Sequence, residues 1–319
     1  FTPLLRHDFH DQDRQLADIH ELYYQYNADN WDLRIGYAQE FWGVLESIHL
    51  IDTINQVDLS QNIDEEDHLG QPMIRFTYSS EDNGDFSLYL LPHFRARTHP
   101  GVKGRIRSSI PISQDQSRYE SDEQGYHLDL AMRWKHSIED FDFGLFSFYG
   151  TSRDPQYSMS LNSPELIPTY NLVWENGFDL QWTHENLLLK SEAVFKQNRF
   201  DSWLSFGFGA EYSFFDINSS GIDLSVLLAY LGDTRKDQDF TQAELQQLVT
   251  LLQTTSRQTG RSRQSFYQND LFLGFRLLFN DSQDTKILFG LIHDLEEATR
   301  LYFIELERRL TDNYSLSFE

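Results

Sequence analysis

The sequence predicts an all-β fold, and more specifically a transmembrane antiparallel up-and-down β-barrel. Apolar and polar residues alternate with a period of two in about fourteen stretches, which is the pattern of a strand with two different faces. Short and long connections alternate between these stretches. Aromatic residues make up 15% of the chain, which is typical of a lipid-facing band with aromatic girdles.

The stretch 126–135 shows the alternation most clearly. One side carries Tyr126, Leu128, Leu130, Met132 and Trp134, and the other carries His127, Asp129, Arg133 and Lys135. A soluble β-sandwich would bury the apolar side, whereas a membrane barrel turns it to lipid and turns the charged side to a watery lumen. The mean hydropathy of −0.53 is low for a soluble core of 319 residues and fits the barrel.

The expected strands follow from this phase. They are 19–27, 31–39, 73–80, 85–95, 126–136, 141–151, 170–182, 187–196, 203–214, 222–231, 271–279, 286–294, 300–310 and a partial strand from Tyr314. Even-numbered positions stay apolar from Tyr170 to Trp182, so this stretch is interpreted as one long strand rather than a hairpin turning at Asn176-Gly177.

The connections predict the topology. Short turns are expected on the periplasmic side at 28–30, 81–84, 137–140, 184–187, 216–221, 281–285 and 311–313. Long extracellular loops are expected at 43–69, 96–123, 152–166 and 232–269. Thr241 and Glu244 have capping-box spacing ahead of leucines at helical intervals, which predicts a short loop helix.

No linker or charge block divides the chain, so residues 1–319 are expected to form one domain. Phe1 begins in the middle of a segment, Glu319 lies inside a strand-like run, and no signal peptide is visible. We therefore expect a chain trimmed at both ends, from a barrel of about 16 to 18 strands.

Composition also limits the function. The net charge of −24 argues against a nucleic-acid partner. The absence of cysteine excludes disulfides and thiolate metal sites. No metal spacing, nucleophile elbow or nucleotide-binding loop is present, so no catalytic residue, metal or cofactor is predicted and an enzyme is disfavoured.

A local motif carries a family resemblance. Its residues are Phe41-Trp42-Gly43, Asp52, Asn55, Asp58-Leu59 and Leu69-Gly70-Gln71-Pro72, with support from Ile19–Tyr23 and Ile167–Tyr170. The chain resembles proteobacterial outer-membrane β-barrels of a porin-like family loosely related to alginate-export-type channels. The resemblance implies a passive channel in the outer membrane of a Gram-negative bacterium, for export or uptake of a small polar or amphipathic solute. The acidic composition argues against a polyanion as that solute.

The candidate site is a pore constriction. The loop 43–69 has an apolar, helix-like row and could fold into the lumen with Glu46, His49, Asp52 and Asp58 as its polar lining, or could cap the rim from outside. Strand phase turns further charges inward, and the candidate pore-lining residues of the wall are Arg34, Arg75, Arg95, Asp129, Arg133 and Glu211. The loop carboxylates are expected to face Arg95 and Arg133, whereas Lys103, Arg105 and Arg107 are interpreted as surface charges.

The favoured function is a channel for a small polar solute through a loop-constricted lumen. The alternative is a structural or interaction barrel whose acidic loops bind a partner or a surface glycan, and a soluble β-rich binding protein is a third hypothesis. Expected partners are outer-membrane lipid and lipopolysaccharide. Divalent cations could bridge the acidic loops, although the run Asp64–His68 lacks the spacing of a calcium loop and is interpreted as solvated.

Overall fold

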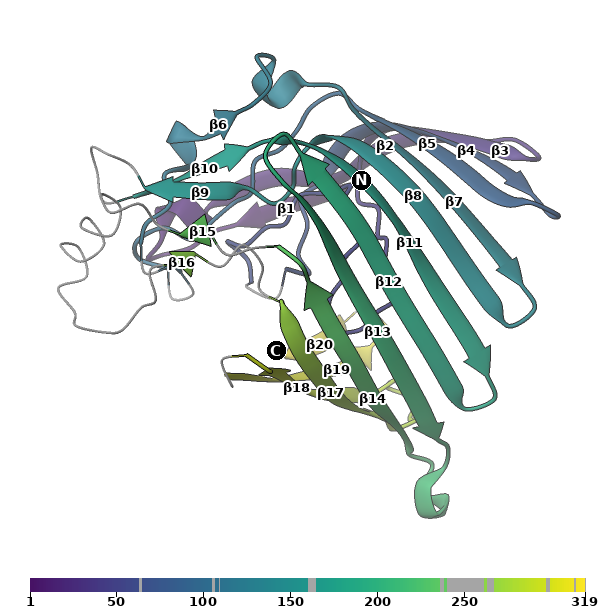
Figure 1. Ribbon diagram of the computed structural model, residues 1–319. Coiled ribbons are helices and arrows are strands. Elements are labelled where there is room, and N and C mark those ends of the chain that lie inside the picture. Colours follow the sequence, from purple (N-terminus) through teal and green to yellow (C-terminus); the bar gives the residue numbers. More distant parts are fainter. Residues whose placement is uncertain are drawn as a thin grey trace.

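A computed structural model describes residues 1–62, 65–104, 107–108, 110–159, 165–235, 238–239, 261–262, 267–296, 299–312 and 314–318. Fifteen strands form one sheet in which neighbours in the chain are neighbours in space, in the order β1-β2-β3-β4-β5-β7-β8-β11-β12-β13-β14-β17-β18-β19-β20. Every pair is antiparallel, as the registers of β11 with β8 and β12 illustrate. The sheet curves around an interior that contains the segment after β3, and its two edge strands, β1 and β20, are not paired with each other (Figure 1).

The strands of this sheet are β1 (Thr2–Arg6), β2 (Leu16–Asn27), β3 (Trp31–Ala38), β4 (Gln71–Ser80), β5 (Gly84–Leu91), β7 (Asp129–Ile138), β8 (Phe141–Thr151), β11 (Leu172–His184), β12 (Leu187–Asn198), β13 (Ser202–Phe214), β14 (Asp223–Asp233), β17 (Asn269–Leu278), β18 (Lys286–Asp294), β19 (Arg300–Thr311) and β20 (Tyr314–Phe318). The long connections add a small sheet of β6 (Arg118–Tyr119), β10 (Leu166–Tyr170) and β9 (Gln156–Met159), and a pair formed by β15 (Gln238–Asp239) and β16 (Arg261–Ser262).

The predicted all-β, up-and-down antiparallel architecture is confirmed. Each expected strand has a counterpart, including the single long strand β11, and β1 is an additional strand that the alternation did not reveal. The expected strand 85–95 ends early, at Leu91, because Pro92 has no N–H to donate to a ladder. The expected strand 126–136 begins only at Asp129, since Gln124–Tyr126 forms a 3₁₀ turn.

The prediction of short loop helices is not matched where the structure describes the loops. The helical elements there are 3₁₀ turns of three residues each, η1 (Gln12–Arg14), η2 (Gln114–Gln116), η3 (Gln124–Tyr126) and η4 (Ile217–Ser219). The apolar row after Gly43 is irregular and not helical, because its backbone donors bind side chains of the sheet, as described below. The helix predicted from Thr241 lies outside the described residues.

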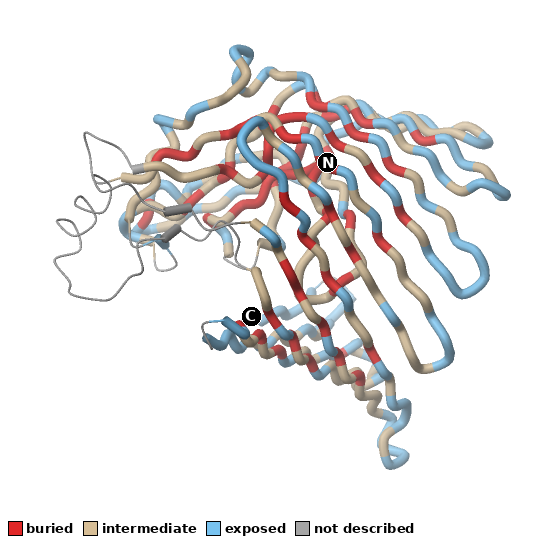
Figure 2. Tube along the Cα trace, viewed as in Figure 1, coloured by how far each residue is buried: buried red, intermediate tan, exposed pale blue. Residues whose placement is uncertain are grey.

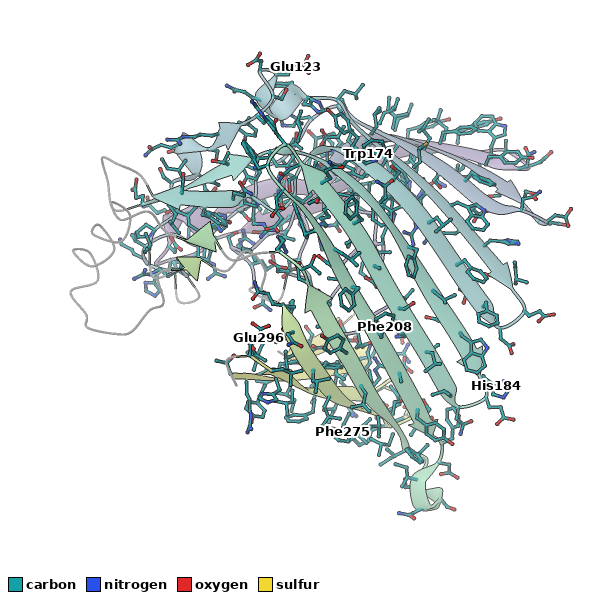
Figure 3. The ribbon with its side chains drawn as sticks, in the orientation of Figure 1. Glu123, Trp174, His184, Phe208, Phe275 and Glu296 are labelled. Carbon is teal, nitrogen blue, oxygen red and sulfur yellow. The ribbon has the colours of Figure 1, made fainter. Side chains whose placement is uncertain are left out.

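The two faces of the sheet differ as the alternation predicts. Trp174, Phe208 and Phe275 are exposed on the outward face (Figure 3), at 55%, 55% and 37%. Inward neighbours on the same strands are less exposed, and burial alternates most clearly along central strands such as β7 and β13 (Figure 2). An exposed aromatic row of this extent is stable only against another apolar phase, which for a barrel wall is lipid.

Three seams of the sheet place a glycine directly opposite a phenylalanine. The pairs are Gly177–Phe146 between β11 and β8, Gly232–Phe206 between β14 and β13, and Gly290–Phe303 between β18 and β19. In each pair the phenyl ring lies where a β-carbon on the glycine would have to be. The missing side chain is therefore filled by the ring of the neighbouring strand.

Candidate functional site

The connection between β3 and β4, described over 39–62 and 65–70, packs against the inner face of the sheet; we call it the docked loop. Its residues Trp42, Ile51 and Ile54 are at most 1% exposed. They form one hydrophobic cluster with inward residues of seven strands, namely Met73, Tyr89, Leu91, Ala131, Phe146, Phe148, Val173, Val194 and Trp203. Of the two alternatives, the structure shows the loop folded onto the inner wall.

A strand carboxylate holds the first part of the docked loop. Glu192 of β12 is fully buried and accepts hydrogen bonds from the backbone N–H groups of Val44, Leu45 and Leu50, at 2.5, 2.9 and 2.9 Å. An ionised carboxylate has enough lone pairs for all three donors, and such charge-assisted bonds are stronger than neutral ones.

Arg133 of β7 lies beneath the same part of the loop. Its guanidinium carbon is 4.8 Å from the centre of the Trp42 ring, and its Nη2 donates to Asp179 on β11 at 2.8 Å. Both charged residues are less than a tenth exposed. The loop thus covers a buried ion pair with an aromatic face, which attracts the cation.

A second arginine holds the middle of the docked loop. Arg153, which follows β8, donates from Nε and Nη2 to the carbonyl of Ile54 at 3.2 and 3.1 Å. Its Nη1 donates to Asp129 at 2.6 Å, and Asp129 also lies 2.7 Å from the Nδ1 of His127. Asp129 is fully buried, so it supports the loop from behind and does not line a passage.

Three titratable residues are buried within the docked loop. Burial raises the pKa of Asp52 to about 8 and lowers that of His49 to about 4. Burial also lowers the pKa of His68, whose Nε2 is 3.7 Å from the Asp52 carboxylate. His49 and Asp52 were predicted as pore lining, but the structure places both inside the loop's own packing, where they favour their neutral forms.

Asp58 was predicted to line the lumen, but its carboxylate binds residues at the rim of the sheet. It accepts hydrogen bonds from Arg6 at 2.9 Å, from the Ser60 hydroxyl at 2.5 Å and from the Thr98 hydroxyl. Burial by itself would raise the pKa of Asp58, but these donors together outweigh it and lower the pKa. The carboxylate therefore ties the docked loop to β1 and to the segment after β5.

Glu46 of the docked loop is partly exposed and joins three wall residues in a group that we call the charged quartet. Glu46 pairs with Arg276 of β17 and lies 3.7 Å from the Nζ of Lys190 on β12. Glu211 of β13 accepts from Arg276 at 2.8 Å and lies 4.0 Å from Lys190. Burial alone would raise the pKa of Glu46, but the two cations lower it. The quartet is neutral, with two charges of each sign.

Arg34 and Arg75, two predicted lining residues, converge on Glu40. Each donates to the Glu40 carboxylate at 2.9 Å, and Arg75 also donates to Asp32 at 2.7 Å. The Tyr89 hydroxyl completes the group at 3.3 Å from Glu40. These side chains are inward and partly exposed, as strand phase predicts.

The position of Arg95 differs from the expectation that it faces the loop carboxylates. Its guanidinium donates to Asp18 on β2 at 2.7 Å and to the carbonyl of Gly70 at 2.8 Å, because β5 ends before it and the chain turns toward the rim. The loop carboxylates therefore do not lie opposite Arg95. Lys103 belongs to an exposed turn, as its interpretation as a surface charge predicts, and Arg105 lies outside the described residues.

A further group of charges joins the long connections at the rim. Arg97 lies 3.5 Å from Glu65 of the docked loop and 3.9 Å from Asp154, and Arg235 donates to Asp154 at 2.5 Å. The group brings residues from all four long connections to one place, so the docked loop is fastened at its outer end as well.

Sequence reasoning missed three residues that carry the docking, namely Trp42, Arg153 and Glu192. Strand phase places Glu192 on the inward face and Trp42 belongs to the family motif, but neither pattern says which segment reaches which wall. A signal was present in the glycines of β13, because Gly207 and Gly209 open space on an inward face, which suggests close approach of another segment.

Within the described ranges, no helix is long and apolar enough to cross a membrane. In the same ranges no three histidine or acidic side chains come together as a group that could hold a metal ion. Asp64 of the acidic run is outside those ranges.

Comparison with known proteins gives a fold-level similarity. The sequence matches no known protein family and no curated protein. Among solved structures, the high-pH structure of OprB from Pseudomonas putida aligns with a TM-score of 0.49 at 10% identity, covering 96% of this chain and 74% of that one.

Proposed function

We propose that the chain is an outer-membrane channel for passive passage of a small polar or amphipathic solute, with the docked loop narrowing its lumen. One combination of features carries the proposal. The outward face of the sheet is aromatic and exposed, whereas the inward face is covered by a buried loop beside which the charged quartet remains partly exposed. An inward loop that leaves only a few charges accessible reduces the aperture to the space around those charges.

The quartet suits a neutral or zwitterionic solute. Glu46 and Glu211 alternate with Lys190 and Arg276, so a passing molecule meets donors and acceptors together and no net charge repels it. Such a site predicts weak selectivity between anions and cations.

Conductance in planar bilayers tests the proposal. The purified chain should form channels with weak ion selectivity, and Glu46→Gln together with Glu211→Gln should shift the selectivity toward anions, because two negative charges leave the quartet. The matched control is Glu307→Gln on β19, which removes an inward charge remote from the docked loop. Absence of channels from correctly inserted protein would contradict the proposal.

The second candidate is a plugged barrel that acts through its acidic rim loops. It is favoured by the depth at which the docked loop is buried, with Asn55 and Gln56 also 1% exposed. Deleting Leu45–Asn62 distinguishes the two. A constricted channel conducts before the deletion and conducts more after it, whereas a plugged barrel conducts only afterwards.

Orientation is tested by cysteine labelling, since the chain has no native cysteine. Ser108 lies in a long connection and Asn83 in a short turn, and both are exposed. An outer-membrane barrel keeps long loops outside, so Ser108→Cys should be labelled in intact cells and Asn83→Cys should not. The opposite result would reverse the orientation.

A further inference from the structure

Two adjacent strands, β12 and β13, carry a recess that matches the first part of the docked loop; we call it the cradle. Glu192 on β12 is the register partner of Gly207 on β13, and Lys190 is the partner of Gly209. Each row of the cradle therefore combines one charged side chain with one glycine. Glycine weakens a strand, so two of them on one inward face indicate that another segment approaches closely there.

The docked loop uses each part of the cradle. The Leu45 side chain fills the space above both glycines: one of its methyl groups lies where a β-carbon on Gly207 would have to be, and the other would be 3.2 Å from a β-carbon on Gly209. The N–H groups of Val44, Leu45 and Leu50 bind the Glu192 carboxylate. Glu46 reaches Lys190 from the same turn of chain.

We propose that Glu192 is the positioning residue that sets the aperture, by holding residues 44–50 in the cradle so that Glu46 is presented to the lumen. The inference deepens the proposed channel function and rests on it. Glu192 does not itself contact the solute, because it is fully buried beneath the loop.

The two acceptor oxygens of the carboxylate are essential to this role. Val44 and Leu45 donate to one oxygen and Leu50 donates to the other, whereas a glutamine amide accepts only at its single oxygen and its NH₂ group opposes the remaining N–H donor. Glu192→Gln therefore keeps the shape of the side chain and removes one of its two acceptor atoms, leaving at least one N–H group of the loop without its partner. The segment is then more stable away from the wall, where water can satisfy that group.

The experiment compares two independent ways of emptying the cradle. Glu192→Gln removes one acceptor oxygen, and Gly207→Ala places a β-carbon where the Leu45 methyl group lies. Both should raise single-channel conductance and cause loss of protection from chymotrypsin at Trp42, which is 1% exposed. The matched control is Glu175→Gln on β11, another buried inward carboxylate, whose ion pair at 3.3 Å is with Lys196 of β12 and not with the loop. It should change neither readout.

Rescue separates positioning from general damage to the barrel. Leu45→Cys with Gly207→Cys should form a disulfide that fastens the loop to the cradle, and these are the only cysteines in the chain. In the Glu192→Gln background the oxidised protein should regain wild-type conductance and protection, and reduction should raise the conductance and remove the protection again. Failure of the disulfide to restore them would overturn the proposal.

The proposed function and this inference can fail separately. If the wild-type protein does not conduct, the channel function is wrong, but protease protection still reports whether Glu192 holds the loop. If it conducts and Glu192→Gln alters neither conductance nor protection, the positioning role is wrong and the channel function stands.

Discussion

The inner face of the sheet has two regions with the same strand pattern and different environments. On β7 to β13, which we call the docked wall, Arg133 and Glu192 are 4% and 0% exposed because the docked loop covers them. On β18 and β19, the open wall, Lys286 and Glu307 are register partners whose ion pair of 2.7 Å has side chains 49% and 56% exposed. The inward phase of a charged side chain therefore does not by itself determine its exposure, which depends on whether another segment lies over it.

The largest loss of stability is expected when a charged side chain is removed from the docked wall. Arg133→Met should lower the free energy of unfolding by about 3–5 kcal/mol, since it leaves Asp179 buried without its cation. Urea unfolding in lipid vesicles measures this. A loss below about 1 kcal/mol would mean that the docked wall is as hydrated as the open wall.

The outward faces of the two regions should respond alike. Phe208→Arg on β13 and Phe289→Arg on β18 are each expected to cost about 2–4 kcal/mol if the position is near the middle of the bilayer. The same unfolding measurement applies. A large cost at Phe208 with none at Phe289 would show that only part of the sheet faces lipid.

The docked loop should also respond to pH in a way that the open wall does not. The pKa of Asp52 is raised to about 8, so this residue stabilises docking at low pH and loses its contribution as the pH rises to 8. The pKa of His49 is lowered to about 4, so this residue stabilises docking above its ordinary pKa near 6.5 and loses its contribution as the pH falls to 4. The two effects offset between pH 4 and 6.5, so protease protection of the loop should fall between pH 6.5 and 8.

Asp52→Asn isolates the histidine contribution. In this variant the fall above pH 6.5 should disappear, and protection should instead decrease on acidification from pH 6.5 to 4. Retention of the wild-type profile would show that another group controls the docking.

The smallest expected effect is on the open wall. Lys286→Gln breaks an ion pair between exposed side chains, which contributes about 0–1 kcal/mol and less at high salt. A loss comparable to that of Arg133→Met would mean that a segment also covers β18 and β19 in the membrane.

The sheet could be predicted from the sequence because the alternation of apolar and polar residues within each strand shows which side chains lie on which face. Leu130 and Asp129 are neighbours with opposite environments, and the alternation alone places them correctly. β1 was missed, since its residues Pro3-Leu4-Leu5 do not alternate. Arg95 was misplaced in its pairing because the strand period was extended past Pro92.

The candidate site was predictable in part. The sequence left an inward position as one of two alternatives for the docked loop and indicated Glu46 as a candidate lining residue, which the structure places in the charged quartet. It could not show that His49 and Asp52 turn into the loop's own packing, or that Asp58 binds Arg6 and Thr98, because an irregular segment has no fixed period. Nor could it identify Glu192 as the anchor of Val44, Leu45 and Leu50, since those contacts join positions 142 to 148 residues apart.

The glycine–phenylalanine pairs help to specify the register in which neighbouring strands of the sheet pair. Antiparallel neighbours can in principle pair in several alignments, and a shift by one residue turns every side chain to the wrong face. If β11 slipped by one position, Phe146 would face Asn176 or Phe178 in place of Gly177, and its ring would lose the space that it occupies over the glycine. Similar pairs stand at the β13–β14 and β18–β19 seams, so the native alignment is favoured at three separated points along the chain.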